Sequence, residues 1–348
     1  MHLKVSAPGR VCLFGEHQDY LGLPVITAAV DLRVNLEGRA VPERVFRLRL
    51  PDIGEERVLS LAEAGRLPYR NKDDFLAAGL NVVHRTGVRW AQGWEVEVHG
   101  EIPLNSGASS SSALQVAWCA FLLLAGGKEN PAPVRAARLA YESEVVEFNA
   151  PGGMMDHYAS ALGDAIWLDC GNPDSVEELP PPAGELLLVD SGQAKKTTEV
   201  LGRVRRPMEP LSHAVRDSRV PLDDLDPERR RMVQANRESL RLTGLARELL
   251  RSRGSIDELG RLLIAHHEQL SLGLGVSTPE IDGWLHEGLR AGALGGKING
   301  SGGGGTFFFL CHKGDTAVEE AMRAAGRRTW RLRMGPGLQW KSAGGAAA

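Results

Sequence analysis

Apolar and polar side chains follow two recurring patterns along the chain, each typical of one kind of element. Short apolar runs and period-two alternation predict strands at residues 4–5, 11–14, 24–36, 45–50, 94–98, 166–168, 186–189 and 306–310. Apolar side chains every three or four positions predict helices at residues 73–86, 109–125, 133–148, 229–252, 255–272 and 279–291. Both patterns occur in each half of the chain without an internal repeat, so we expect an α+β protein.

A proline-rich stretch at residues 173–185 interrupts these patterns. Proline and glycine break regular elements, and a run of them is typical of a connection between domains. The chain has 348 residues, which is enough for two domains. We therefore expect one domain at residues 1–184 and a second at residues 185–348.

The composition of the chain speaks against two classes of binding partner, nucleic acid and membranes. The chain is 43% hydrophobic and 24% charged, with a formal net charge of −3, which is ordinary for a globular protein. Such a charge attracts neither nucleic acid nor anionic lipid, and the sparse aromatic residues do not interleave with a basic patch. The longest apolar stretch, residues 116–125, is too short to span a bilayer. We expect neither a nucleic-acid partner nor a membrane partner.

The cysteines and the N-terminal residues indicate a compartment. Cys12, Cys119, Cys170 and Cys311 lie far apart, each in an apolar run. This spacing predicts free, buried thiols in a reducing compartment rather than a metal site. The first ten residues lack the apolar core of a signal peptide. We expect a cytoplasmic protein.

Residues 9–22, GRVCLFGEHQDYLG, place an unusual polar cluster directly after an apolar strand. Glu16, His17, Gln18, Asp19 and Tyr20 follow one another without a gap, with a glycine on each side. A strand that ends in two carboxylates, an imidazole, an amide and a phenol is unusual, and it marks these residues as a candidate site.

Residues 103–114, PLNSGASSSSAL, form a loop of small and hydroxyl residues that leads directly into an apolar helix. Small residues let backbone N–H groups converge on a ligand, and the helix N-terminus favours an anion. The loop lacks the Gly-Lys-Ser/Thr ending of a Walker motif. It indicates a phosphate site, although a serine N-cap with a flexible loop would also explain it.

Two further segments contain closely spaced glycines. Residues 295–310, GGKINGSGGGGTFFFL, contain more glycines than a hairpin needs, which indicates close packing against another backbone or a ligand. In residues 149–170, Gly152 and Gly153 precede an apolar segment that carries the lone acid Asp156. That acid is either a helix N-cap or a buried functional carboxylate.

Taken in order, these motifs resemble those of the GHMP small-molecule kinases, and galactokinases most of all. Residues 7–20 resemble the galactokinase signature, and residues 103–114 are similar to the phosphate loop of that family. Residues 152–163, 274–282 and 295–305 are similar to its later motifs. The resemblance implies a two-domain fold with an N-terminal α+β domain, a C-terminal ferredoxin-like domain and an active site between them.

The resemblance also implies an ATP- and Mg²⁺-dependent sugar kinase that phosphorylates the anomeric hydroxyl of galactose or a close relative. Asp156 would accept the proton of the attacking hydroxyl or orient it, with Arg10 beside it. The implied sugar-binding residues are Glu16, His17, Asp19 and Gly153. The implied ATP-binding residues are Ser106, Gly107, Ser109, Ser110, Ser111, Ser112, Gly302, Gly303 and Gly304. Ser111 and Glu144 would bind the magnesium ion, because hard cations prefer oxygen ligands.

Several positions depart from the galactokinase pattern. Asn105 and Ala108 replace a glycine and a leucine of the loop, and His157 stands where galactokinases have glutamine. The segment from residue 190 lacks the tyrosine that galactokinases place near a sugar hydroxyl. Leu21 and Leu23 replace smaller polar residues, so we expect an altered pocket wall.

Two alternatives remain open at this point. One is a mevalonate kinase, against which Arg10, Asp19 and Asp156 speak. The other is a sugar-sensing regulator without catalysis, which we would expect to lack part of the catalytic set. We expect a monomer or a homodimer that binds a monosaccharide and ATP.

Overall fold

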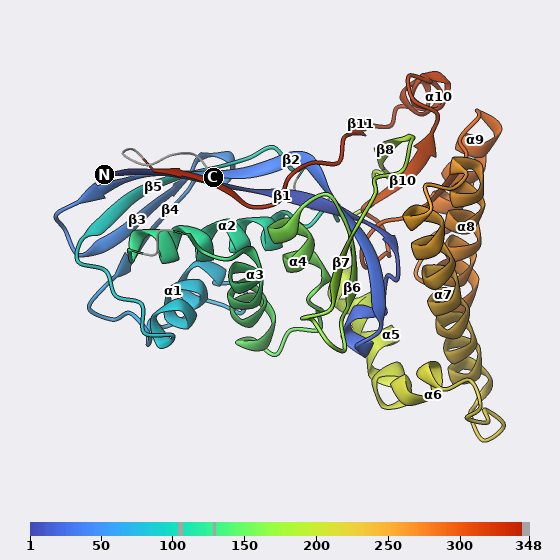
Figure 1. Cartoon of the computed structure of the whole chain (residues 1–348), viewed down its shortest axis with the longest axis horizontal. Coiled ribbons are helices and arrows are strands. Elements are labelled where there is room, and N and C mark those ends of the chain that lie inside the picture. The colour runs from blue at the N-terminus through green and yellow to red at the C-terminus, as the bar shows by residue number, and fades with distance from the viewer. Residues whose placement is uncertain (104–106, 128–129, 343–348) are drawn as a thin grey trace.

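The computed structural model describes residues 1–103, 107–127 and 130–342. Two β-sheets organise these residues, and helices pack against each (Figure 1). The predicted α+β class is confirmed. In the part of the chain that is described, no helix is both long enough and apolar enough to cross a membrane.

The first sheet has eight strands, with β12-β1-β2-β5-β3-β4 along its main path and β6 and β7 branching from β2. Its strands are β1 (His2–Phe14), β2 (Pro24–Val41), β3 (Val45–Leu50), β4 (Glu55–Ser60), β5 (Gly93–Gly100), β6 (Ala165–Asp169), β7 (Val176–Leu179) and β12 (Gln339–Ser342). The helices of this part are α1 (Phe75–Arg85), α2 (Ser110–Ala125), α3 (Pro133–Tyr141) and α4 (Met155–Leu162). They lie together on one face of the sheet (Figure 1).

Helix α2 supplies the centre of the first core. Its side chains from Val116 to Leu123 are all fully buried between the sheet and the neighbouring helices. A helix that is apolar all round is stable only when it is enclosed in this way. This burial fixes the N-terminus of α2, which begins at Ser110.

The second sheet has four antiparallel strands in the order β11-β8-β10-β9. These are β8 (Glu185–Asp190), β9 (Gly295–Ile298), β10 (Thr306–Cys311) and β11 (Thr329–Leu332). The helices are α5 (Thr197–Met208), α6 (Ser212–Arg216), α7 (Pro227–Arg251), α8 (Ile256–Glu268), α9 (Pro279–Arg290) and α10 (Ala317–Ala324). The chain thus runs strand, helices, two strands, helix, strand, which is the expected ferredoxin-like arrangement.

The last strand, β12, does not join this second sheet. It pairs antiparallel with β1, so that Leu3 faces Ser342. The predicted second domain, residues 185–348, therefore includes a strand that belongs to the first sheet, because the backbone after β11 crosses back to it. The division at residue 184 remains a prediction.

Other differences from the sequence pattern are local. The proline-rich stretch at 173–185 contains a short strand, β7, which pairs with β6. The two strand starts predicted at 4–5 and 11–14 belong to one long strand, β1, with irregular register at Pro8 to Arg10 and at Cys12 to Phe14. All four cysteines are free and buried, as expected.

Candidate active site

A cavity of about 250 Å³ lies where the end of β1 meets the N-terminal parts of α2, α4 and α5. Its volume is close to the lower end of the range for small-molecule sites, about 300 Å³. Many residues singled out from the sequence line it: Arg10, Glu16, His17, Asp19, Ser109, Ser111, Ser112, Glu144, Gly153 and Asp156. These residues come from segments far apart in the chain, and the fold brings them to one cavity.

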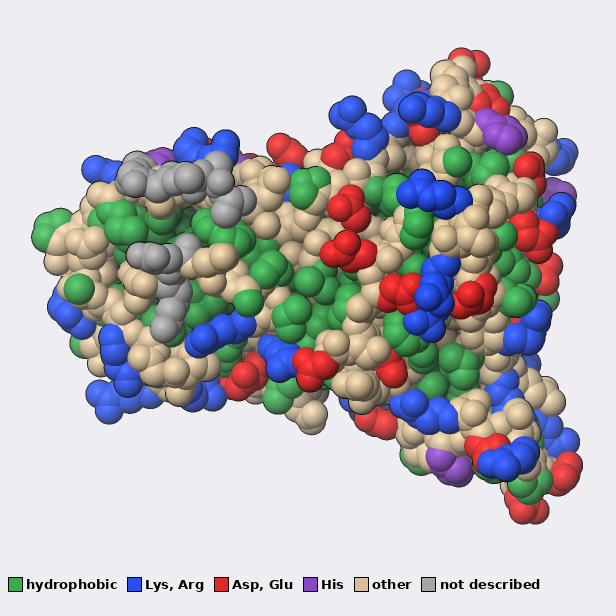
Figure 2. Space-filling model, viewed as in Figure 1, with side chains coloured by type: hydrophobic (Ala, Val, Ile, Leu, Met, Phe, Trp, Pro, Cys, Tyr) green, Lys and Arg blue, Asp and Glu red, His purple; other side chains and the backbone are tan. Residues whose placement is uncertain are grey.

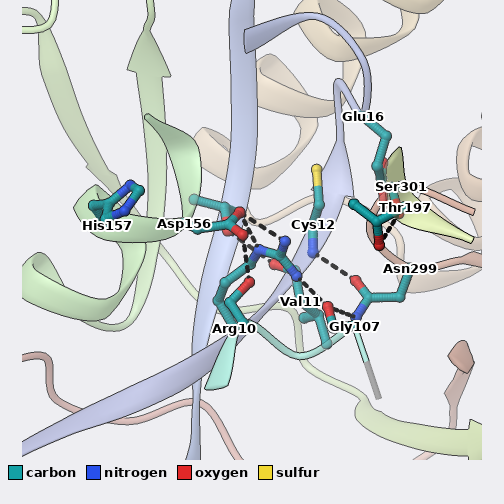
Figure 3. Close-up of polar contacts among 12 residues, drawn as sticks. Arg10, Val11, Cys12, Glu16, Gly107, Asp156, His157, Thr197, Asn299 and Ser301 are labelled. Carbon is teal, nitrogen blue, oxygen red and sulfur yellow. Dashed lines mark hydrogen bonds and ion pairs between the residues drawn. The ribbon is translucent and has the colours of Figure 1, made fainter. Parts of the chain in front are cut away.

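Arg10 and Asp156 form an ion pair inside this cavity (Figure 3). The Arg10 Nε and Nη2 atoms lie 2.7 and 2.6 Å from Asp156 Oδ1. The other Asp156 oxygen accepts a hydrogen bond of 2.6 Å from the Ser109 hydroxyl. The Asp156 side chain does not cap helix α4, whose N-cap residue is Met154. The N-cap interpretation of this acid is therefore wrong.

The partners of Asp156 keep its carboxyl group ionised. Burial by itself would raise the pKa of Asp156, but the charge of Arg10 and the Ser109 hydroxyl together hold it below its usual value. Arg10 is itself fixed, because its Nη1 donates to the Gly107 carbonyl at 2.7 Å. Asp156 is thus a rigidly held hydrogen-bond acceptor.

The polar cluster after β1 is buried. Glu16, His17 and Asp19 are exposed by 1, 4 and 9%. One Glu16 oxygen forms an ion pair with Lys297 of β9, and the other has no hydrogen-bond partner in the described part of the chain. A buried carboxylate oxygen without a hydrogen-bond donor is costly, and Glu16 is one of the residues that line the cavity.

His17 is held in its neutral form. Its Nδ1 lies 3.0 Å from the Tyr20 hydroxyl and its Nε2 lies 3.1 Å from the carbonyl oxygen of Ser301. Burial lowers the pKa of His17 to about 4, although the Ser301 carbonyl acts in the opposite direction. Since a carbonyl can only accept, Nε2 carries the hydrogen.

Asp19 differs from Asp156 in its environment. Burial, followed by the nearby charge of Asp156, raises the pKa of Asp19 to about 6. Its carboxylate lies against Gly153, where a β-carbon would overlap it. A glycine is therefore required at position 153 to leave room for this acid.

Gly107, which belongs to the predicted phosphate site before α2, contacts the second part of the molecule. The Asn299 side chain donates to the Gly107 carbonyl at 3.2 Å and accepts from the Cys12 amide at 3.1 Å (Figure 3). Ser109 has a φ of +61°, an unusual conformation for a residue with a β-carbon. This strained turn directs its hydroxyl to Asp156. Ser110 is the first residue of α2, and Ser106 lies outside the described residues.

The glycine-rich segment after β9 is arranged differently from the expectation. Gly300 and Ser301 line the cavity, whereas Gly302, Gly303 and Gly304 do not. A β-carbon at Gly302 would overlap the Val276 carbonyl, and one at Gly304 would lie against Ala194. In the described loop, it is Asn299 and Gly300 that meet Gly107. The ATP-binding role of the three later glycines remains a prediction.

Glu144 and Ser111, the predicted magnesium ligands, both line the cavity. One oxygen of Glu144 lies 2.8 Å from His157 Nε2. The described residues contain no cluster of three or more His, Cys, Asp and Glu side chains suited to a metal. Oxygen donors from Glu144 and Ser111, completed by phosphate oxygens, still fit a hard divalent cation.

Sequence reasoning missed several contributors to the site. Lys195, Thr197 and Thr198 line the cavity from the start of α5, and Lys297 pairs with Glu16. Lys297 lies in the glycine-rich segment at residues 295–310, where the glycines, and not the lysine, indicated a function. Burial, followed by the charge of Arg10, lowers the pKa of Lys195.

The expected change of the pocket wall at Leu21 and Leu23 is wrong. Neither residue lines the cavity, and both are buried in the core of the second part. They belong to the same cluster of buried apolar side chains as Val189 and Met208. The two leucines therefore join the two parts of the molecule instead of contacting the ligand.

Three family models match the chain. The galactokinase galactose-binding signature matches residues 3–39, the GHMP kinase N-terminal domain residues 75–164 and the GHMP kinase C-terminal domain residues 245–330. The chain belongs to the GHMP kinase family. The matched ranges contain Arg10, Glu16, Asp19, Glu144, Asp156 and Lys297.

Relatives of this GHMP kinase family member include two kinds of enzyme. A mevalonate kinase of Thermococcus sibiricus is 28% identical over 335 residues, covering 94% of both chains. A galactokinase of Thermococcus kodakarensis is 29% identical over 326 residues, covering 90% of both.

Solved structures show the same fold. Lactococcus lactis galactokinase complexed with galactose has a TM-score of 0.84 at 21% identity, covering 97% of this chain and 94% of that one. Methanococcus jannaschii mevalonate kinase has a TM-score of 0.75 at 20% identity, covering 96% and 99%.

Proposed function

We propose that this protein transfers the γ-phosphoryl group of ATP to the anomeric hydroxyl of galactose or a closely related monosaccharide. The observation that carries the proposal is the cavity in which Arg10, Asp156 and Ser109 lie beside the buried acids Glu16 and Asp19. The first group suits phosphoryl transfer, and the second suits an acceptor rich in hydroxyl groups. The match to a galactose-binding signature over residues 3–39 supports a sugar.

In this proposal the ionised Asp156 accepts a hydrogen bond from the attacking hydroxyl. Its lowered pKa makes it a weak base, so it orients the hydroxyl and takes the proton as the new P–O bond forms and the bond to ADP breaks. Arg10 balances charge beside it. A magnesium ion held by Glu144 and Ser111 would neutralise phosphate charge.

A second cavity is a candidate binding site for the adenine base of ATP. It lies next to Ser110 and Ser111, and its wall includes Val34, Leu50, Ile53, Val98, Ile102 and Leu114. An apolar cleft that opens beside a phosphate loop suits a flat base such as adenine. ATP would then extend from this cleft past the N-terminus of α2 to Asp156.

The test is an ADP-release assay with and without Mg²⁺ across galactose, glucose, arabinose, fucose, galacturonate, glucuronate, N-acetylgalactosamine and mevalonate. We expect galactose or a C4 or C6 variant to be the best acceptor, with the phosphate located at C1 by NMR. A product phosphorylated at C6, or a tenfold preference for glucose, would contradict the proposal.

Mevalonate kinase is the second candidate, favoured by the mevalonate kinase of Thermococcus sibiricus among the relatives. Mevalonate is an acid, and Lys195 is a cation at the cavity that could meet it. Turnover with mevalonate above that with every sugar would establish this candidate. Absence of turnover with all acceptors would favour a regulator without catalysis.

A further inference from the structure

Lys297 is a fully buried cation whose hydrogen-bonding capacity is used up. Its ammonium group donates to the Cys12 carbonyl at 3.0 Å and to the Ile298 carbonyl at 2.8 Å, and it forms an ion pair with Glu16. An ammonium group has three hydrogens to donate, so these partners satisfy it completely. Lys297 has no donor left for a ligand.

Glu16, in contrast, is only half satisfied. Lys297 occupies one carboxylate oxygen, while the other is buried and has no hydrogen-bond partner among residues 1–103, 107–127 and 130–342. Glu16 lines the cavity, whereas Lys297 does not. The unused acceptor of the pair is therefore on the residue that can meet a ligand.

The ion pair belongs to a set of contacts that fix the end of β1 from the second part of the molecule. His266 of α8 accepts from the Gly15 amide at 3.0 Å. Asn299 accepts from the Cys12 amide at 3.1 Å (Figure 3). Lys297 adds a bond to the Cys12 carbonyl. The backbone that leads into Glu16 is thus held at Cys12 and Gly15, and Lys297 is the contact that fixes the Glu16 carboxylate.

We propose that Lys297 is a positioning residue for the acceptor, holding Glu16 so that its second oxygen receives a hydrogen bond from one hydroxyl of the substrate. This inference deepens the proposed function and rests on it. Lys297 lies just before the glycines at residues 300–305, three of which are predicted to bind ATP. If Lys297 only stabilised this segment, its replacement would weaken ATP binding and not the selectivity for the acceptor. Positioning of Glu16 predicts a loss of acceptor selectivity, whereas structural support of the glycine-rich segment predicts a loss of ATP affinity.

The experiment compares E16Q, K297M, K297R and the double variant E16Q/K297M, using the acceptor that wild type turns over best and analogues that each lack one hydroxyl. E16Q should lose at least about tenfold in kcat/KM on the full acceptor, because the charged group that accepts a hydrogen bond from one substrate hydroxyl is gone. The loss should be small on the analogue that lacks this hydroxyl. K297M should show the same selectivity change, with ATP Kd within twofold of wild type. K297R, which keeps the charge, should retain more of the selectivity than K297M.

K297M leaves the Glu16 charge buried without its partner and can fail to fold, whereas E16Q/K297M replaces both charges with neutral groups of similar shape. The decisive comparison is therefore between E16Q and the double variant. If Lys297 acts through Glu16, the two should agree within twofold in kcat/KM for every acceptor. A further tenfold loss in the double variant, or an equal loss of ATP affinity, would overturn the inference.

The proposed function is tested separately by the identity of the wild-type acceptor. If mevalonate proves to be that acceptor, the sugar kinase proposal fails, but the comparison of E16Q with E16Q/K297M still decides the role of Lys297.

Discussion

The Asp19 carboxylate packs directly on the α-carbon of Gly153, in space that a β-carbon at position 153 would occupy. This contact joins the polar cluster after β1 to the loop that carries Asp156. Gly153 is therefore needed so that Asp19, a candidate substrate-binding acid, can occupy its position. The neighbouring Gly152 is not constrained in this way, because its β-carbon would meet Val145 at an ordinary 3.4 Å.

Gly153→Ala should therefore displace Asp19 and lower kcat/KM for the acceptor by at least about tenfold, as for a lost hydrogen bond to a charged group. The affinity for ATP should stay within twofold. Gly152→Ala is the matched control and should leave both quantities nearly unchanged. Calorimetric titration with ATP and steady-state kinetics would measure them, and equal effects of the two substitutions would contradict the packing argument.

The raised pKa of Asp19, about 6, predicts a pH dependence of acceptor use. If the ionised acid binds the acceptor, kcat/KM should fall about tenfold between pH 7 and pH 5, since kcat/KM reports the ionisation of the free enzyme. His17 has a pKa of about 4 and does not contribute in this window. Asp19→Asn should be less active but lack this fall.

The same pKa has a consequence for stability. A carboxyl group with a pKa above its unfolded value favours the folded state when protonated, and that contribution is lost as the pH rises through about 6. Replacing Asp19 by Asn should therefore raise Tm more at pH 7.5 than at pH 4.5. If the difference in Tm between wild type and Asp19→Asn were the same at pH 4.5 and pH 7.5, Asp19 would have an ordinary pKa.

Asp156→Asn should reduce kcat by at least about 10²-fold, the range for loss of a general base or key orienting group. ATP affinity should change little, because Asp156 is not among the predicted ATP-binding residues and the proposal places it beside the attacking hydroxyl. Single-turnover kinetics and ATP titration would separate the two effects. Turnover within a few-fold of wild type would show that this acid has no role in the transfer step.

Ser109 combines a hydroxyl bond to Asp156 with a φ of +61°. Ser109→Ala and Ser109→Gly both remove the hydroxyl, so both should lower kcat. Glycine adopts this backbone conformation without strain, so Ser109→Gly should be more stable than Ser109→Ala by about 1 kcal/mol. Urea unfolding of both variants would measure the difference, and equal stabilities would show that the strain is absent.

Sequence patterns predicted those elements whose side chains interact mainly with their own core. The strand at 45–50 and the helix at 279–291 agree with β3 and α9 because their periodicity reflects one buried face. Strand β12 carries no such pattern, and its pairing depends on β1, more than 330 residues earlier in the chain. Long-range pairing of this kind leaves no local signal.

The site was predicted to a similar extent. The resemblance to the GHMP kinases identified Arg10 and Asp156 as candidate catalytic residues, but their mutual contact depends on the fold. The partner of Glu16 was not predicted, since nothing in the sequence near Lys297 indicates that its side chain is buried. Figure 2 shows acidic and basic side chains interspersed around α7–α10, an arrangement that the net charge of −3 does not by itself predict.

The pairing of β12 with β1 also determines when the first sheet can be completed during protein synthesis. On the ribosome, β1 is made first and β2 can cover one of its edges early, but the other edge waits for residues 339–342. During most of synthesis that edge exposes unpaired backbone groups, which are prone to join other chains. The first sheet can therefore be completed only after the whole second sheet has emerged, and nascent chains should need protection at β1 until then.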